Sequence, residues 1–256
     1  MTAAETWRDA LAAWALPEHI LAGAEESPWI HPPELFTLPP VIATTPSHER
    51  AREAMPVGGT VLDVGCGGGI AAFAVAPPAS RVIGVDHQAA MLAMFNEAAA
   101  ARGLSCTTVE GFWPAVADEV EVADVVTSHH VVYNVSDIVP FLASLADHAR
   151  ARVVIEMPDR HPLSSMSDAW RHFWNLERPA EPTPDDLLAV LAEMGIAATR
   201  EEFVAPLVEN HDPKRTAHFA RVRLCLPAAR EAEVADYLAN QPSAIARRLS
   251  TIWWDV

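Results

Sequence analysis

The stretch VLDVGCGGGIAAF, residues 61–73, decides the fold of this chain. It begins as an apolar run typical of a buried β-strand, passes through alternating glycines and ends in an alanine-rich run that predicts a helix. Gly65, Gly67 and Gly69 allow backbone conformations and close approaches that a Cβ would block. The start of such a helix directs free N–H groups toward a bound ligand. Asp86, which ends the next predicted strand, can accept hydrogen bonds from both hydroxyls of a ribose.

The spacing of the glycines separates two classes of cofactor. A dinucleotide fingerprint, G-x-G-x-x-G, would need its third glycine at Ile70 or Ala72. The pattern present is D-x-G-x-G-x-G, and its acid, Asp63, would repel a pyrophosphate but suits a ligand that carries an ammonium group. An NAD(P)-dependent oxidoreductase and an ordinary strand-to-helix turn remain the alternatives at this point.

With this motif the chain resembles the class I S-adenosylmethionine-dependent methyltransferases. The resemblance covers roughly residues 55–226, with motifs at 61–69, 81–87, 109–114 and 124–135. It implies S-adenosyl-L-methionine as the cofactor and S-adenosyl-L-homocysteine as the product. By the same resemblance Asp63 lies near the methionine amino group and Asp86 holds the ribose.

The resemblance also implies a set of cofactor-binding residues. Where this chain has Glu110-Gly111, family members often carry Gly-Asp, so the sequence departs from the family there. His87 is expected near the adenine or ribose, Met91 over the ring, and Phe112 or Trp113 on one face of the adenine slot. The full set is Asp63, Gly65, Cys66, Gly67, Asp86, His87, Met91, Glu110, Gly111, Phe112, Trp113, Ser128 and His129.

Strands and helices alternate along the chain, which predicts an α/β fold with helices on both faces of the sheet. We expect a doubly wound, mostly parallel seven-stranded sheet whose last strand is antiparallel, because the final two predicted strands have no room for a helix between them. The predicted strands lie at 60–64, 81–86, 104–111, 123–130, 151–158, 196–206 and 216–227.

The chain divides into three predicted parts. Residues 1–45 begin with helical segments and continue into a proline-rich run, so we expect them to form an N-terminal cap. Residues 46–226 form the predicted S-adenosylmethionine-binding domain, with an insertion on the substrate side at 158–180. Residues 227–256 are expected to form a C-terminal helix and a tail that pack on the same domain.

The segment SHHVVYN, residues 128–134, follows the fourth predicted strand and would border the reacting end of the cofactor in the family. Neighbouring side chains on a strand point to opposite faces, and no partner ligands stand nearby, so we expect no metal site. A histidine can act as the base when the acceptor is a hydroxyl or a protonated amine. His130 is the first candidate and His161 the alternative, with Tyr133 and Asn134 orienting the substrate. Hydrogen bonding of the histidines to backbone is the competing interpretation.

Further aromatic residues are candidates for the wall of an acceptor pocket. Trp29, His31 and Trp170 are the substrate-binding candidates, although aromatic side chains also simply fill cores. The segment at 128–134 lacks the Pro-Pro pair of the methyltransferases that modify DNA bases. We therefore predict an enzyme that methylates oxygen or nitrogen of a small molecule. A binding module without transferase activity is the alternative within the same fold.

Composition narrows the class of protein further. The 256 residues carry a formal net charge of −16, which disfavours nucleic acid as a partner. The three cysteines are far apart in sequence and form no CxxC pair, as expected of reduced thiols in a cytosolic protein. No apolar stretch has the length of a membrane span and none resembles a signal peptide, so we expect a cytoplasmic protein without membrane contact. The oligomeric state is left open.

Overall fold

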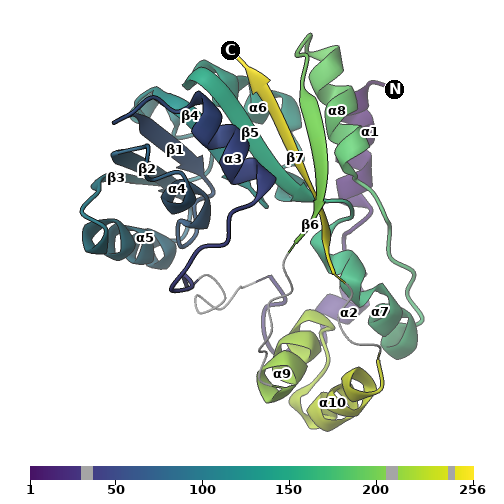
Figure 1. Ribbon diagram of the computed structural model, residues 1–256. Coiled ribbons are helices and arrows are strands. Elements are labelled where there is room, and N and C mark those ends of the chain that lie inside the picture. The colour runs from purple at the N-terminus through teal and green to yellow at the C-terminus, as the bar shows by residue number, and fades with distance from the viewer. Residues whose placement is uncertain (30–36, 206–212, 242–245) are drawn as a thin grey trace.

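The computed structural model describes residues 1–29, 37–205, 213–241 and 246–256. Its centre is a seven-stranded sheet with the order β3-β2-β1-β4-β5-β7-β6 (Figure 1). The strands are β1 (Thr60–Val64), β2 (Arg81–Asp86), β3 (Ser105–Glu110), β4 (Ala123–His129), β5 (Ala149–Pro158), β6 (Thr199–Val204) and β7 (Arg248–Asp255). Strands β1 to β5 are parallel, and β7 runs antiparallel to both β5 and β6. The predicted fold class is confirmed.

The alternation of side chains along the strands divides the core between the two faces of the sheet. In β1, Leu62 belongs to one apolar cluster and Val61 to the other. The Leu62 face is covered by α1 (Ala3–Ala12), α6 (Ile138–Asp147) and α8 (Pro184–Glu193). The Val61 face is covered by α3 (Pro46–Ala54), α4 (Ile70–Ala74) and α5 (Ala89–Ala101). Parallel strands buried on both faces explain the continuous apolar runs in the sequence.

Four further helices form a separate apolar cluster below the sheet in Figure 1. They are α2 (Glu18–Leu21), α7 (Ser167–Trp174), α9 (Pro213–Arg223) and α10 (Glu231–Ala239). Their buried contacts include Ile20, Trp170, Leu224 and Val234, one from each segment or its end. The predicted insertion at 158–180 thus contributes α7 to this cluster.

The position of the seventh strand was predicted wrongly. The segment 216–227 lies largely in α9, where Ala217, Ala220, Arg221 and Leu224 are buried at helical spacing. The antiparallel strand is β7, which comes from the tail and is inserted between β5 and β6. The sheet therefore extends well beyond the predicted domain boundary at residue 226.

The first helix is bonded into the domain at its start and near its middle. Thr2 closes a capping box with Glu5, and the N–H of Ala3 donates to both carboxylate oxygens of Glu193 at 2.8 Å. The indole Nε1 of the fully buried Trp7 donates to the carbonyl of Val135 at 2.8 Å. These contacts hold α1 beside the turn that follows β4. Within the described ranges, no helix is long and apolar enough to cross a membrane.

Candidate active site

A cavity of about 1250 Å³ opens at the carboxyl ends of the central strands. Its floor comprises the glycine loop and the ends of β2, β4 and β5, while α1 and α3 supply side chains to its walls. Ligands of doubly wound sheets bind at this edge, near the point where the strand order reverses. In this sheet that point lies between β1 and β4.

The glycine loop is shaped by the residues packed against it. Gly65 has φ +73°, and a Cβ there would lie 2.4 Å from a methyl carbon of Val131. Gly67 also has positive φ, at 49°. The N–H groups of Gly65 and Cys66 both donate to the carbonyl of Val85, at 2.8 and 3.0 Å, and so tie the loop to the end of β2. The loop thus exposes backbone, without side chains, toward the cavity.

Asp63 lies at the base of the loop and is almost completely buried. Its carboxylate accepts hydrogen bonds from the N–H of Ala72 at 3.2 Å and from the hydroxyl of Thr127 at 3.1 Å. Burial raises the pKa of Asp63 to about 7, the hydrogen bonds oppose that shift and the charge of Asp86 adds to it. A cation bound nearby would favour the ionised form of this carboxyl.

Asp86 is held rigidly at the end of β2. One carboxylate oxygen accepts the N–H of Gly67 at 3.0 Å and the other accepts the N–H of Gln88 at 2.9 Å. Each oxygen of an ionised carboxyl can accept two hydrogen bonds, so both keep capacity for a pair of ligand hydroxyls. The ribose-binding role of Asp86 stays a prediction that this arrangement allows.

An aromatic pair borders the same part of the cavity. The imidazole of His87 stacks on Phe112 with ring centroids 4.6 Å apart, and Phe112 keeps 69 % of its surface exposed. Met91 is buried on α5 and lines the cavity from inside. Trp113 lines the cavity too, but it is largely buried in the core and packs edge-on against His148. Phe112 therefore offers the more accessible ring face.

His130 directly follows β4 and has a left-handed conformation with φ 62°, which is uncommon for a residue with a side chain. Its N–H donates to the carbonyl of Glu156 at 2.8 Å, and its imidazole Nε2 lies 3.1 Å from Glu156 Oε1. The imidazole Nδ1 is buried and has no hydrogen-bond partner among the described residues. His130 and Glu156 both line the cavity.

Glu156 lies within β5, opposite His129 of β4 and Thr251 of β7. Its second oxygen accepts the hydroxyl of Thr45, at the start of α3, at 3.1 Å. Burial alone would raise the pKa of Glu156, but hydrogen bonds from His130 and Ser47 and the nearby imidazoles hold it well below its usual range. Glu156 is therefore an ionised acceptor, and the geometry assigns the proton of His130 to Nε2.

His129 turns to a different partner from His130. Its ring stacks on that of His48 of α3 with centroids 5.6 Å apart, and its Nε2 is buried without a hydrogen-bond partner. Burial lowers the pKa of His129 to about 3, opposed by the charge of Glu156, so the ring is neutral. His48 is buried and its Nδ1 accepts the N–H of Thr45 at 3.1 Å. His129 and His48 thus form an uncharged wall beside the His130–Glu156 pair.

His161, the alternative base, is committed to local contacts. Its Nδ1 accepts the N–H of Leu163 at 3.2 Å, and its ring stacks on Trp14 at 4.1 Å between centroids. Burial and the charge of Arg178 lower its pKa to about 4, against a hydrogen bond to the backbone of Tyr133. Because both ring nitrogens have partners, His161 has no free lone pair for a substrate proton. These contacts favour a structural role over the predicted catalytic one.

The structure brings most of the predicted site residues to one cavity. Those that line it are Trp29, Asp63, Gly65, Cys66, Gly67, Asp86, His87, Met91, Gly111, Phe112, Trp113, His129, His130, Tyr133, Asn134 and His161.

Three predicted residues do not line the cavity, and one lies outside the described residues. Glu110 is exposed at the end of β3. Ser128 is buried and its hydroxyl donates to the carbonyl of Val64 at 3.1 Å. Trp170 is buried in the helical cluster, with Arg178 over its ring at 5.5 Å. His31 falls in the segment that the structure leaves undescribed.

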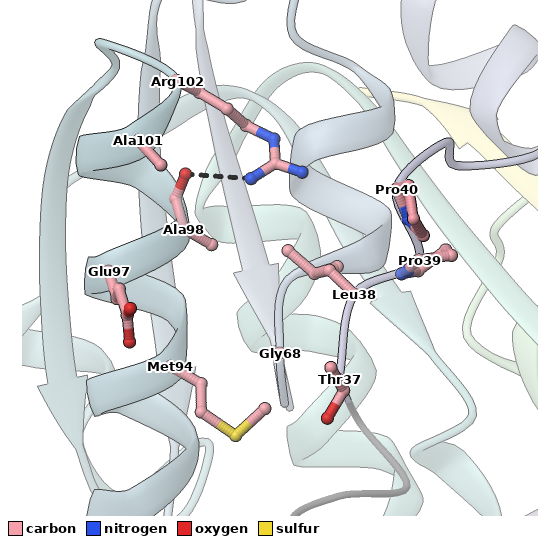
Figure 2. Close-up of a pocket in the computed structure, with 10 residues that line it drawn as sticks. All are labelled: Thr37, Leu38, Pro39, Pro40, Gly68, Met94, Glu97, Ala98, Ala101 and Arg102. Carbon is pink, nitrogen blue, oxygen red and sulfur yellow. Dashed lines mark hydrogen bonds between the residues drawn. The ribbon is translucent and has the colours of Figure 1, made fainter.

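A smaller hollow of about 370 Å³ lies beside the glycine loop (Figure 2). It lies between residues 37–40 and α5, and it shares Pro39 and Gly68 with the main cavity. Arg102 at its rim donates to the carbonyl of Ala98 at 3.0 Å, as Figure 2 shows, and covers the ring of Phe73. The described residues of this hollow include no buried polar side-chain atom that lacks a partner. Nor does any group of three or more potential metal ligands occur in the described part of the chain.

Comparison with known protein families identifies the domain around the cavity. Residues 61–152, which run from the glycine loop through β4 to β5, match the family described as a methyltransferase domain. This methyltransferase domain is of the class I, S-adenosylmethionine-dependent kind. The cofactor of this methyltransferase is S-adenosylmethionine, and the side-chain-free loop together with the fixed carboxylate of Asp86 fits such a group. No curated protein matches its sequence.

Solved structures share the fold of this methyltransferase at low sequence identity. The YcgJ protein of Bacillus subtilis is 16 % identical, covers 82 % of this chain and 97 % of its own, and has a TM-score of 0.55. A cyclopropane-fatty-acyl-phospholipid synthase-like protein of Lactobacillus casei is 14 % identical over 80 % and 87 %, with a TM-score of 0.53. Precorrin 8W decarboxylase of Methanobacterium thermoautotrophicum is 14 % identical over 90 % and 97 %, with a TM-score of 0.51. These likenesses establish the fold.

Proposed function

We propose that this methyltransferase acts on an oxygen or nitrogen atom of a small-molecule acceptor and that His130 removes the acceptor's proton. The observation that carries the proposal is the pair of His130 and Glu156, 3.1 Å apart at the edge of the cavity. Because Glu156 accepts from Nε2, Nδ1 is the ring nitrogen of His130 that keeps an unused lone pair; it is buried, so the acceptor has to pack directly against the ring to reach it. Histidine is the side chain that exchanges protons near neutral pH.

The same geometry supports the cofactor roles that the family resemblance implies. Asp86 would accept the ribose hydroxyls, Asp63 would lie toward the amino group, and Phe112 would stack on the adenine. Backbone of the glycine loop approaches the ligand at Gly65 and Gly67. When bound, S-adenosylmethionine supplies a methyl group activated by a sulfonium, so the protein contributes mainly orientation and exclusion of water.

Glu156 acts through His130 as a positioning residue. It fixes the tautomer and the ring orientation of His130, and its negative charge stabilises the imidazolium that forms when the proton is transferred. Thr45 and Ser47 of the α3 region hold the carboxylate in turn. A preorganised pair of this kind does not have to reorganise during the reaction.

The volume of the cavity and the net charge of the chain support a small acceptor. A cavity of about 1250 Å³ is larger than the roughly 300–1,000 Å³ typical of a single ligand, so it has room for the cofactor and a second molecule. Tyr133, Asn134 and Trp29 line the part beyond the glycine loop. The net charge of −16 disfavours a polyanionic nucleic acid as the acceptor.

A labelling experiment tests the class of acceptor. The enzyme would be incubated with S-adenosylmethionine labelled on the methyl group and a cell extract, which is then separated by ultrafiltration into small molecules and macromolecules. We expect enzyme-dependent label among the small molecules. Label confined to protein or RNA would overturn the proposal.

Once an acceptor is in hand, three variants test the proton transfer. His130→Gln should lower kcat by about 10²–10⁴, as expected for losing a general base. Glu156→Gln should lower it less and shift the pH profile of kcat. His161→Gln serves as the matched control, because His161 lines the same cavity yet should be dispensable for chemistry. Equal turnover of His130→Gln and wild type would exclude His130 as the base.

A further inference from the structure

Helix α9 carries two buried arginines whose surroundings differ. Arg221 is 2 % exposed and its guanidinium bonds with the carboxylates of Glu26 and Glu231. Arg223 is 5 % exposed. Among the described residues, its guanidinium donates to the backbone carbonyl of Pro28. Over the described ranges, no carboxylate forms an ion pair with Arg223, and its Nη2 has no hydrogen-bond partner.

A buried guanidinium without a counter-ion is costly. Arginine stays protonated in proteins, so burial does not remove its charge but penalises it, and burial lowers the pKa of Arg223 accordingly. Its ring neighbour, Phe219, lies 5.0 Å from the guanidinium carbon and offers only a partial compensation. An unsatisfied buried donor of this kind calls for an explanation, and a bound anion is one that would complete its hydrogen bonds.

Arg223 lines the large cavity, and a second arginine lines it as well. Arg247 precedes β7 and is exposed, and its backbone carbonyl accepts the N–H of Ala205 at 2.8 Å. Its charge acts on Tyr133: burial raises the pKa of that phenol, and Arg247 opposes the rise. Arg247 and Tyr133 therefore line the same cavity within electrostatic range of each other.

The acids of the cavity lie elsewhere and are already bonded. Asp63 and Asp86 belong to the glycine-loop side and Glu156 to the end of β5, each with hydrogen-bond donors of its own. The third arginine of the lining, Arg8, has a carboxylate partner in Asp137 at 3.9 Å. Among the described residues of the lining, the positive charge that lacks a carboxylate partner is thus confined to Arg223 and Arg247, in a chain with a net charge of −16.

We propose that the methyl acceptor carries an anionic group, a carboxylate or a phosphate, which Arg223 binds and which the charge of Arg247 in the same cavity attracts. This inference rests on the proposed transfer to a small molecule. Arginine presents its donors as a fork that matches either anion. Trp29, which follows Pro28 and lines the cavity, supplies an apolar surface next to the anion site, so the acceptor combines an apolar body with an anionic end.

Binding to the protein saturated with S-adenosylhomocysteine tests the inference without knowledge of the acceptor. Benzoate would be titrated against benzamide, and phenyl phosphate against phenol, by calorimetry. We expect at least one anion to bind ten-fold or more tightly than its neutral counterpart. The pair with the larger ratio of affinities shows whether the site prefers a carboxylate or a phosphate. Equal affinities within both pairs, or no binding of any of the four, would overturn the proposal.

Variants assign the preference to its residues. Arg223→Gln should abolish the preference for the anion and Arg223→Lys should keep part of it. Arg230→Gln is the matched control, because it removes the same charge from a surface pair with Glu233. If Arg223→Gln does not fold, the exposed Arg247→Gln decides, with a three-fold or greater loss expected. A preference that survives both changes would contradict the inference.

The two proposals fail separately. Charge preference is read by equilibrium binding, whereas transfer to small molecules is read by label. Label in neutral small molecules with no preference for anions would overturn the anion site alone. A preference for anions with label only in macromolecules would overturn the proposed transfer to a small molecule and leave the anion site itself in place.

Discussion

Gly65 of the glycine loop lies directly against Val131, the second residue after β4, so closely that a Cβ on Gly65 would come within 2.4 Å of it. The cofactor loop and the turn that carries His130 are therefore packed as one unit. The contact explains why this position must be glycine for two independent reasons, its positive φ and the lack of space.

Gly65→Ala should consequently do more damage than its backbone conformation alone predicts. Left-handed φ costs a residue with a Cβ about 1–2 kcal/mol. Gly195→Ala is the matched control, because Gly195 has φ +78° and no neighbouring atom within 4 Å of the place that a Cβ would take. We expect the control to lose only that amount in urea unfolding and Gly65→Ala to lose more. S-adenosylhomocysteine binding should fail only in Gly65→Ala, and equal behaviour of the two variants would refute the packing argument.

Replacing Asp86 by Ala should weaken the binding of S-adenosylhomocysteine by about 1–3 kcal/mol, the range for hydrogen bonds to a charged group. Asp124→Ala is its control, since Asp124 also accepts a backbone N–H, that of Thr60 at 2.8 Å, but does not line the cavity. Calorimetric titration measures both variants. An unchanged affinity of Asp86→Ala would show that another residue holds the ribose.

Phe112 allows ligand stacking to be separated from stability. Because 69 % of its surface is exposed, Phe112→Ala should leave the free energy of unfolding nearly unchanged. It should nevertheless lower the affinity for S-adenosylhomocysteine by about 1 kcal/mol, roughly five-fold, by removing an aromatic contact. Val57→Ala, at a position 96 % exposed, is the control for truncating a surface apolar side chain. Unaltered affinity would leave Phe112 without a role in binding adenine.

The pH dependence of stability should carry the signature of Asp63. Its pKa is about 7 in the folded protein against an ordinary value of 3.8, so between these values the folded protein holds a proton that the unfolded chain has lost. Stability from this group is present at low pH and declines as pH rises toward about 7. Asp63→Asn, which can still bond to Ala72 and Thr127, should remove that decline. Relative to wild type, the variant should gain about 2–3 kcal/mol between pH 5 and pH 8 in urea unfolding of the cofactor-free protein. Parallel curves would contradict the raised pKa.

The sequence was most informative where local signals agree with the fold. The first five strands are short apolar runs separated by helical patterns, and each lies where it was predicted. For α8 the boundaries follow from Thr183, whose capping box with Asp186 starts the helix, and from Gly195 after its end. Such signals depend on neighbours in sequence, so they can be recognised without knowledge of tertiary contacts.

The seventh strand shows where this reasoning fails. The segment TAHFARVRLCLP, residues 216–227, contains apolar residues at both strand and helix spacing, and packing of Ala217 and Leu224 selects the helix. The tail was expected merely to pack on the domain. It forms β7 because its alternate side chains pack on both faces of the sheet. Ile252 and Trp254 belong to one apolar cluster, and Trp253 packs against the other.

Only the cofactor-binding part of the site was predictable from the sequence. The cofactor motifs lie in consecutive loops, but the partner of His130 comes from β5 and its supports from α3. One signal for Glu156 was visible, a carboxylate inside the apolar run ARVVIEMP. Arg223 gave none, because its burial depends on Pro28, 195 residues away. Long-range contacts of this kind leave no trace in local spacing.

The insertion of β7 between β5 and β6 has a consequence for the order in which the protein can be built. The strand β6 has a single neighbour in the sheet, and that neighbour is synthesised after it. During translation the first five strands can pair as they leave the ribosome, whereas β6 has to wait for the residues that follow α10. Arg247 and Leu249, which line the cavity, arrive with that last strand. A nascent chain can thus form its glycine loop early and complete the wall of the cavity last.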